Sequence, residues 1–597
     1  MLAGPIFSRE FQITPRQVTH FVTRAGYVAG LFVLMYTAGQ ATFGWQQSKS
    51  VGEVARFGGL LFQIFSFVQL SLVLFFAPLF AAGRVAQEKD RQTLILLLMT
   101  DLRDRELVFG KLLSSLLPVG VLLLASAPVF TLVSILGGIT PGQIAGSLAL
   151  CAATALAAGS WGTLVAFWRE KTFQTLAISA LGIVLFLGVI EAIVALAAGV
   201  PPLIRAVALV NPFRALVLVI DPLSSPGGVA VVVNHVVALL AIALLVNVVT
   251  VMRLRVWNPS RAAFEAAAAR QQPIADATHA VGVPDLAGPP PEGGTPTTSA
   301  QPTREIWSNP VIWREIRTRA YGRRMIIIKL AYFVLCAFAV AFLVNVQQAG
   351  RASELILGMI SAHGFAFVGL SLVGLMLINA QAVTSLTTER DGRTLELLLV
   401  TDISAREFVF GKLGGALYNA KETILIPLAG LTILAVRGVV EWENFVYLVL
   451  GFLLLAWFAS MLGLHAGLSF DNSRAAIANS LGTMFFLFLG VFLCMLLIVE
   501  ARSSFLLQLP SFMVFILGGS LGLWASLTYK NPSPALTLSA LVLPFFTFYA
   551  ITGFLLNDTL GIWAVVTATY GFTTLAMLIP AVSEFDVALG RTTLDKG

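Results

Sequence analysis

The feature that most constrains this chain is a series of apolar stretches, each long enough to cross a lipid bilayer. A membrane-spanning helix needs about 20 mostly apolar residues. Twelve stretches meet this requirement: 25–45, 58–82, 112–137, 144–168, 174–199, 229–252, 325–346, 355–380, 413–436, 444–468, 475–499 and 559–580. Only 12% of all residues are charged, against roughly 25% in a typical soluble domain. The sequence therefore predicts an all-α polytopic membrane protein.

Two further apolar stretches leave the number of spans open. Residues 504–528 and 535–556 flank the segment Lys530-Asn-Pro-Ser-Pro534. They are either two additional spans, which would give 14 in all, or helices that enter and leave the membrane on one side. Both alternatives place the C-terminus on the same side, because two spans preserve parity.

A charged segment of 25 residues, called the charged cassette below, occurs twice in this apolar chain. The copies run from Glu88 to Leu112 and from Glu389 to Leu413, and 16 of the 25 positions are identical without a gap. This identity indicates an internal duplication. Because a bilayer tolerates such charge only at its surface, each cassette is expected in water against the membrane.

Two shorter echoes support the duplication. Pro5–Phe11 resembles Pro310–Ile316 ahead of the first span of each half, and Asn211–Leu216 resembles Asn531–Leu536 ahead of the last. The common order predicts two six-span halves in a parallel repeat, about an axis normal to the membrane.

The predicted halves are residues 1–265 and 306–597, and their coupling segments 83–111 and 384–412 contain all but the last residue of each cassette. Residues 266–305 are rich in Pro and Gly and predict a flexible linker that only tethers the halves.

Basic residues gather in alternate loops, which predicts the orientation. Arg84 to Lys111 separates the second and third spans, whereas 137–143 on the opposite side has no Lys or Arg. The positive-inside rule makes the cassettes, the N-terminus and the linker cytoplasmic. It also explains the net charge of +7 without nucleic acid. The first 24 residues lack the features of a removable signal peptide.

Within each cassette, the leucine run is too short to cross a bilayer and predicts a helix at the membrane interface. Thr100 or Asp101 is expected to cap the helix of the third span, with Glu106 in its first turns. The alternative is an ordinary cytoplasmic loop, which the duplication disfavours.

The cassette resembles the cytoplasmic coupling segment of ABC-2 type transporter permeases. That family joins its second and third spans with Glu-Lys/Arg, Thr-Leu-Glu-Leu-Leu, Thr-Pro and Glu-x-x-x-Gly-Lys. The matching stretches here are Glu389-Arg390, Thr394-Leu-Glu-Leu-Leu398 and Glu407-Phe-Val-Phe-Gly-Lys412. The first copy has Ile95 in place of Glu396, and both copies have Asp where the family often has Pro.

The resemblance implies the membrane subunit of an ATP-driven exporter in the cytoplasmic (inner) membrane, in contact with lipid. The chain has no Gly-x-x-x-x-Gly-Lys-Ser/Thr phosphate loop. It is therefore expected to be no enzyme and to bind no cofactor. ATP and Mg²⁺ would be held by a partner ATPase in two copies. Exporters of ions, drugs, lipids and polysaccharides share this frame.

The residues expected to carry ATPase coupling are the polar positions common to both cassettes. They are Glu88, Asp90, Thr93, Glu106, Lys111, Glu389, Asp391, Thr394, Glu407 and Lys412. Polar groups inside spans are rare and often line a transport path. The candidates for that role are Glu191, His235, His363 and Glu422.

Other chemistry is disfavoured. The histidines show no metal-ligand spacing, and the three cysteines sit in apolar runs without paired spacing. Two other functions stay open. An ion-coupled secondary transporter would need intramembrane charges placed symmetrically in both halves, and a non-transporting membrane scaffold would anchor an ATPase without flux.

Overall fold

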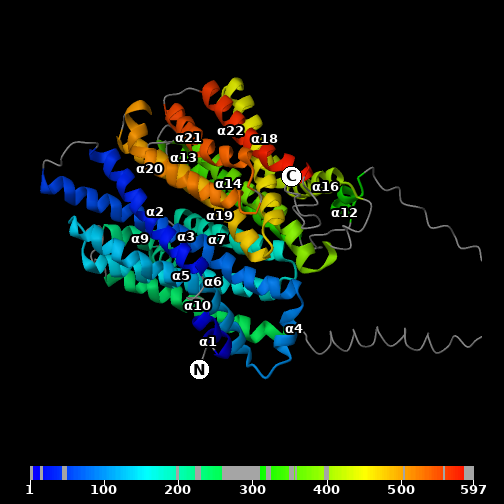
Figure 1. Ribbon diagram of the computed structural model, residues 1–597. Coiled ribbons are helices and arrows are strands. Elements are labelled where there is room, and N and C mark those ends of the chain that lie inside the picture. Colours follow the sequence, from blue (N-terminus) through cyan, green and yellow to red (C-terminus); the bar gives the residue numbers. More distant parts are fainter. Residues whose placement is uncertain are drawn as a thin grey trace, which may run out of the picture.

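The computed structural model consists almost entirely of helices (Figure 1). It describes residues 4–13, 18–43, 50–196, 201–221, 230–258, 309–317, 325–348, 355–356, 360–395, 403–501, 505–530, 532–555 and 559–583. The predicted linker 266–305 lies outside these ranges. Within them, 13 helices are long and apolar enough to cross a membrane, or 15 spans if each of two bent pairs counts as one.

Helices occupy all six predicted spans of the first half. They are α2 (Val18–Phe43), α3 (Val51–Asp90), α5 (Asp104–Ile135), α6 (Pro141–Trp168), α7 (Thr172–Leu196) and α10 (Ala230–Trp257). Shorter helices precede, interrupt or join them: α1 (Gly4–Ile13), α4 (Thr93–Leu98), α8 (Pro201–Ala208) and α9 (Pro212–Ile220).

The second half has the corresponding helices and two more. They are α13 (Met325–Gln348), α14 (Ala362–Asp391), α16 (Ala405–Asn419), α17 (Lys421–Val436), α18 (Trp442–Ser469), α19 (Ser473–Ala501), α20 (Phe505–Leu527), α21 (Pro534–Leu555) and α22 (Thr559–Ser583). The short α12 (Pro310–Arg317) precedes α13, and a hairpin of β1 (Leu355–Ile356) and β2 (Ile360–Ser361) precedes α14.

The duplication is visible in the helix bounds themselves. A shift of 301 residues converts the end of α3 into the end of α14, and the start of α5 into the start of α16. The same shift converts α6 into α18 at both ends and the start of α7 into the start of α19. The two halves are therefore tandem copies in parallel, as the sequence predicts.

Close packing of the second span on the fourth is also duplicated. A Cβ added at Gly162 of α6 would lie 2.4 Å from the Pro78 carbonyl oxygen of α3. A Cβ added at Gly463 of α18 would lie 2.7 Å from the Asn379 carbonyl oxygen of α14. Small residues allow helix backbones to approach this closely in a membrane.

The second half is larger because α20 and α21 are both of span length. This supports the prediction of 14 spans when α16 and α17 are counted as one. The first half has instead the pair α8–α9, bent by 91°. The two Asn-Pro segments precede corresponding helices, because α10 follows α9 as α22 follows α21. The helices that begin at these segments differ in length: α9 has 9 residues and α21 has 22.

The third span also differs between the halves. In the first half α5 is continuous, although it contains Pro118. In the second half the helix bends by 55° between α16 and α17, at Ala420. The predicted span 413–436 is therefore formed by a bent pair of helices.

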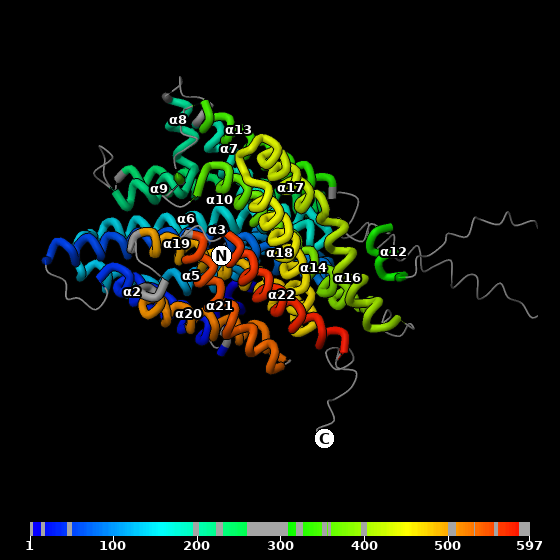
Figure 2. Tube along the Cα trace, turned by 90° about the horizontal axis from the view of Figure 1, so that it is seen from above, coloured from blue at the N-terminus to red at the C-terminus, as the bar shows by residue number. Residues whose placement is uncertain are grey.

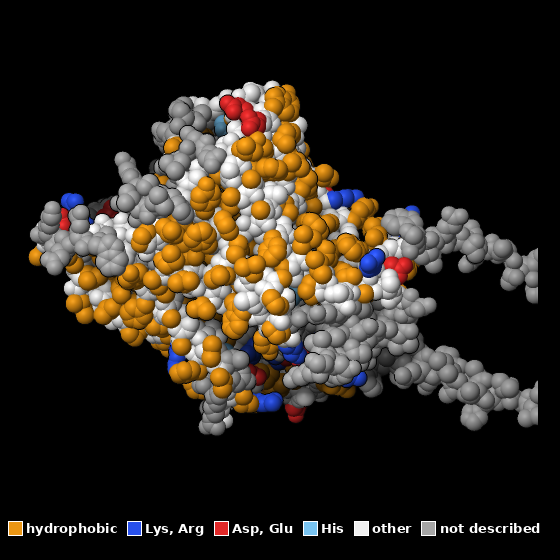
Figure 3. Space-filling model, turned by 45° about the horizontal axis from the view of Figure 1, so that its top comes forward, with side chains coloured by type: hydrophobic (Ala, Val, Ile, Leu, Met, Phe, Trp, Pro, Cys, Tyr) orange, Lys and Arg blue, Asp and Glu red, His pale blue; other side chains and the backbone are white. Residues whose placement is uncertain are grey.

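The halves meet along α3, α7, α14 and α19, whose apolar side chains share one buried cluster. Figures 1 and 2 show the first half in blue to green and most of the second half in yellow to red. α13 packs on α7 across the boundary, whereas α2 packs mainly on α20. Apolar side chains cover much of the face in Figure 3, as expected for a surface in contact with lipid.

Candidate functional site: the two charged cassettes

Each cassette begins with the same backbone turn. Gln92 and Arg393 have φ angles of 58° and 54°, the only positive values among the non-glycine residues that the structure describes. The hydroxyls of Thr93 and Thr394 then donate to the carbonyls of Glu88 and Glu389, at 3.3 and 3.2 Å. Left-handed conformations are uncommon outside glycine, so this matching pair indicates a shared and specific turn.

An ion pair in each half joins the end of the second span to the start of the third. Lys111 contacts Glu88 in the first half. Lys412 lies 2.8 Å from Glu389 in the second. The Lys412 side chain is 1% exposed and that of Lys111 is 12% exposed. These predicted residues therefore meet one another and position the helices, because little of either lysine is available to a partner.

The basic residue after each glutamate holds the end of the fourth span. Lys89 donates to the carbonyls of Phe167 and Arg169, at 2.6 and 2.9 Å. Arg390 donates to the corresponding end of α18, at the carbonyls of Gly467 and Phe470. Cations near the last carbonyls of a helix satisfy free acceptors and interact favourably with its dipole. The cassette thus ties the second, third and fourth spans together.

A short amphipathic helix completes each site. These elbow helices are α1, which packs on α5, and α12, which packs on α16. Glu10 of α1 lies 3.3 Å from Arg84. Glu315 of α12 lies 2.6 Å from Lys412, and Arg314 contacts Glu389. The echo Pro5–Phe11 and Pro310–Ile316 was the sequence signal for these partners.

Burial and charge act against each other at Glu315, which is 1% exposed. Burial raises the pKa of its carboxyl, but Lys412 and Arg314 outweigh that effect and hold the pKa below its usual value. The second half therefore has a buried cluster of two acids and two bases where the first half has two separate pairs.

The aspartates near the boundary of the halves differ in their partners. The Arg91 guanidinium lies 3.1 Å from the Asp391 carboxylate and so joins the first cassette to the second. Asp391 is 4% exposed and Arg91 is 50% exposed. Gly392 stands where Arg91 would be repeated, and Asp90 accepts a hydrogen bond from Thr172 instead.

Glu106 and Glu407 begin the third spans as predicted, but the caps differ from the prediction. The first helix residue is Asp104, so Arg103 and not Thr100 or Asp101 is the N-cap residue. Its backbone N–H donates to the Glu106 carboxylate at 3.3 Å. The predicted caps lie too early because Leu102 and Arg103, which follow them, are not yet helical.

The second copy has a reciprocal cap. The Ser404 hydroxyl accepts from the Glu407 N–H at 3.3 Å, and the Ser404 N–H donates to the Glu407 carboxylate at 3.0 Å. The Ser404 hydroxyl also donates to the Glu407 carboxylate at 2.8 Å, and this bond together with that from the Ser404 N–H lowers the pKa of the Glu407 carboxyl. Both third spans thus begin with an acidic residue that favours a helix N-terminus.

The leucine run of the first cassette forms the short helix α4, as predicted. Leu94 and Leu98 are buried, whereas Leu96 and the following Met99 are 64% and 56% exposed. Exposed apolar side chains among charges are typical of a protein contact surface. The matching run of the second copy, 396–400, lies outside the described residues.

The four predicted path residues do not converge. Glu191 binds Arg214 at 2.7 Å and Asn211 at 2.7 Å, and this ion pair is half-exposed. Glu422 pairs with Lys329 of α13, and both side chains are about one-third exposed. These charges are paired within their own halves.

The two histidines of this set are also placed singly. His235 is buried in α10 and its Nδ1 lies 3.2 Å from the Val231 carbonyl of the same helix. His363 lies at the start of α14, at the end away from the cassette. Within the described ranges, no three metal-ligating side chains gather into a site that could hold an ion.

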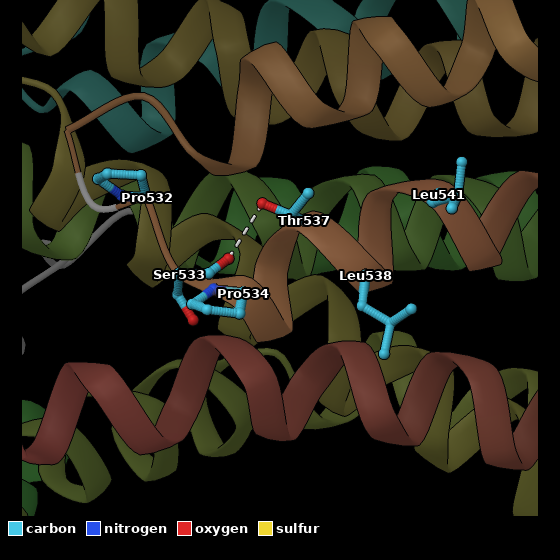
Figure 4. Close-up of a pocket in the computed structure, with 6 residues that line it drawn as sticks. All are labelled: Pro532, Ser533, Pro534, Thr537, Leu538 and Leu541. Carbon is cyan, nitrogen blue, oxygen red and sulfur yellow. Dashed lines mark hydrogen bonds between the residues drawn. The ribbon is translucent and has the colours of Figure 1, made fainter.

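A surface depression with a volume of about 500 Å³ lies elsewhere, at the start of α21. Figure 4 shows its lining: Pro532, Ser533, Pro534, Thr537, Leu538 and Leu541. The Thr537 hydroxyl donates to the Ser533 carbonyl at 3.1 Å. With no ionisable group in this lining, the depression offers no catalytic or metal-binding chemistry.

The long helices and the cassettes between the second and third spans define a multi-pass membrane permease. Comparison with protein families identifies the permease family to which the chain belongs. Residues 46–252 and 309–506 each match a family described as ABC-2 family transporter protein. The chain belongs to this family and contains two of its permease units in tandem. Family permeases are the non-catalytic membrane components and work with ATP-binding subunits. No curated protein matches the chain.

Proposed function

We propose that this protein is the membrane subunit of an ATP-driven exporter and that separate ATP-binding subunits act on its two cassettes. The observation that carries the proposal is the duplicated network that ties three spans to each cassette. Lys111 and Lys412 hold the third spans, and Lys89 and Arg390 hold the fourth.

This network gives a physical route for force. A push on a cassette moves the ends of the second, third and fourth spans together, because each is held by charged hydrogen bonds that are costly to break when buried. The exposed Leu96 of α4 and Met99 directly after it supply the contact for the first ATP-binding subunit. The remaining predicted coupling residues position that contact.

The movement would separate the halves. Arg91–Asp391 and the hydrogen bond from Gln87 to Asn472 at 3.4 Å close the cassette side of the boundary. Rocking of two parallel repeats about their common axis opens such a boundary on one side at a time. The halves then expose a central path alternately to each face.

ATP and Mg²⁺ would be bound by the partner, in two copies because the chain presents two cassettes. The basic loops favour a cytoplasmic position for the cassettes, the N-terminus and the linker, in a cell with an inner membrane. Export is the direction proposed. Glu191, His235, His363 and Glu422 remain candidates for contact with substrate once the halves separate.

The test is reconstitution with the ATP-binding subunit in lipid vesicles. ATP-dependent efflux and stimulated ATP hydrolysis are expected together, and Leu96→Glu should abolish both while the fold persists. Stimulated hydrolysis without any flux would support the membrane scaffold instead. Flux driven by an ion gradient without ATP would support the secondary transporter.

A further inference from the structure

The two halves contact each other along two helix pairs, called the seams below. The duplication relates one seam to the other, but their side chains differ in chemistry. The first seam lies between α3 and α19, and the second lies between α14 and α7. The 301-residue shift relates α3 to α14 and α7 to α19. A side chain present on only one seam is therefore a difference that the duplication itself does not explain.

Phenylalanine rings join the halves at the first seam. Phe75 stacks on Phe485 with ring centres 4.3 Å apart, and Phe76 lies 6.3 Å from Phe486. Phe80 extends the row, 5.4 Å from Phe76. The residues at the corresponding positions of the second seam are not aromatic: Met376, Leu377, Gln381, Val184 and Leu185.

These rings are accessible from outside the protein. Phe486 is 56% exposed, and Phe75, Phe76, Phe80 and Phe485 are partly exposed. The second seam is covered by α13, which packs on α7. Its counterpart α2 packs mainly on α20, one of the two helices that only the second half has, so it covers α19 less.

Arginines gather at the cassette end of the same seam. Arg84 and Arg91 come from the end of α3 and are paired with Glu10 and Asp391. Arg474 comes from the start of α19, within electrostatic range of both arginines and of Glu10 and Glu88. The corresponding positions of the second seam are uncharged: Ser385, Gly392 and Phe173. Among the described residues, no acidic oxygen lies within 4.0 Å of Arg474.

We propose that the first seam binds an anionic membrane lipid, with its head group at the arginines and its chains against the phenylalanines. That this lipid belongs to the transported substrate class rests on the proposed function, whereas its binding at the seam does not. The arginines lie at the membrane surface, where a basic residue attracts an anionic head group by about 1 kcal/mol, or roughly fivefold in affinity. The rings supply apolar area at the depth of the lipid chains.

The same surface disfavours an ion or a small polar solute. Residues 57–83 of α3 and 475–499 of α19 contain no Asp, Glu, Lys, Arg or His. An ion that loses its water here would meet no opposite charge, and the polar Asn479 and Thr483 of α19 are already hydrogen-bonded to Ser526. A lipid places only its chains in this region.

The experiment measures lipid retention by the intact chain without any ATP-binding subunit. The protein is purified from micelles with equal amounts of phosphatidylglycerol and phosphatidylcholine, and the retained lipids are counted by native mass spectrometry. Preferential retention of phosphatidylglycerol is expected. Arg474→Phe, which installs the residue of the second seam, should lower that preference about fivefold.

Matched variants separate the two parts of the proposal. Phe485→Val should reduce retention of both lipids without changing the preference, and Ser385→Ala on the second seam should change neither. Equal retention of the two lipids by the unchanged protein would overturn the proposal, and so would an unchanged preference in Arg474→Phe. Displacement by glycerol phosphate as effectively as by the lipid would show that the rings take no part and would also overturn it. Because no ATPase is present, none of these failures would bear on the proposed coupling.

Discussion

The two cassettes share one framework but differ in how firmly each is held to its elbow helix. Both have the same left-handed turn, the same glutamate–lysine pair and the same grip on the fourth span. In the second, Glu315 and Arg314 of α12 join that pair in one buried cluster. In the first, Glu10 of α1 turns away to Arg84. The shared contacts therefore define how each cassette is attached to its spans, and the differing contacts set how rigidly each cassette is held.

The largest expected difference comes from removing the lysine of each cluster. Lys412→Met leaves two buried carboxylates without their main partner and should cost about 3–5 kcal/mol of stability. Lys111→Met leaves a single carboxylate that is 24% exposed and should cost clearly less. Thermal unfolding of both variants in detergent measures this, and equal losses would contradict the comparison.

Adding a methyl group to the close contact between the second and fourth spans should lower the stability of both halves by similar amounts. Gly162→Ala and Gly463→Ala each place a Cβ against a backbone carbonyl and should destabilise by about 1–3 kcal/mol. Gly451→Ala in α18 is the control, because nothing lies within 4 Å of its added Cβ. Tolerance of either of the first two changes would show that this contact is not shared.

Acid should weaken the second elbow through Glu315. Its pKa is lowered in the folded protein, so its ionised form stabilises the fold above the unfolded pKa of 4.5. That contribution is lost as the pH falls from there through the folded value. Glu315→Gln should therefore flatten the acid side of a profile of unfolding temperature against pH. Glu10→Gln at the first elbow is the matched control, and an identical flattening there would remove the distinction.

The smallest effect is expected at the bridge between the cassettes. Arg91→Ala, Asp391→Ala and the double variant form a cycle whose coupling energy should be about 1 kcal/mol or less, because Arg91 is half-exposed. Unfolding temperatures supply the energies. A coupling above about 3 kcal/mol would be typical of a buried pair and would mean that the bridge locks the halves together.

Much of this architecture could be predicted from the sequence, because spans and repeats leave long, regular patterns. The twelve clear spans, the parallel repeat and the α4 helix follow from hydropathy and identity alone. The elbow helices could be predicted from the similarity between their two sequences. Their ion pairs could not, since Glu315 and Lys412 are 97 residues apart. Only the folded helices bring them together.

Other features had no local signal. The bend at Ala420 contains no proline at the break, whereas Pro118 at the matching place leaves α5 continuous. At both positions, packing against other helices, and not the local preference of the residue for bending a helix, decides whether the helix bends. The ion pairs of Glu191 and Glu422 could not be predicted from the sequence either, because their partners Arg214 and Lys329 belong to other helices.

The central claim is that a separate ATP-binding subunit grips the exposed face of the cassette, and one measurement tests it directly. The rate of ATP hydrolysis by that subunit is compared alone, with this chain, and with the chain that carries Leu96→Glu. The claim predicts stimulation by the unchanged chain and loss of that stimulation by the variant, at an unchanged unfolding temperature. Equal stimulation by both chains would contradict it.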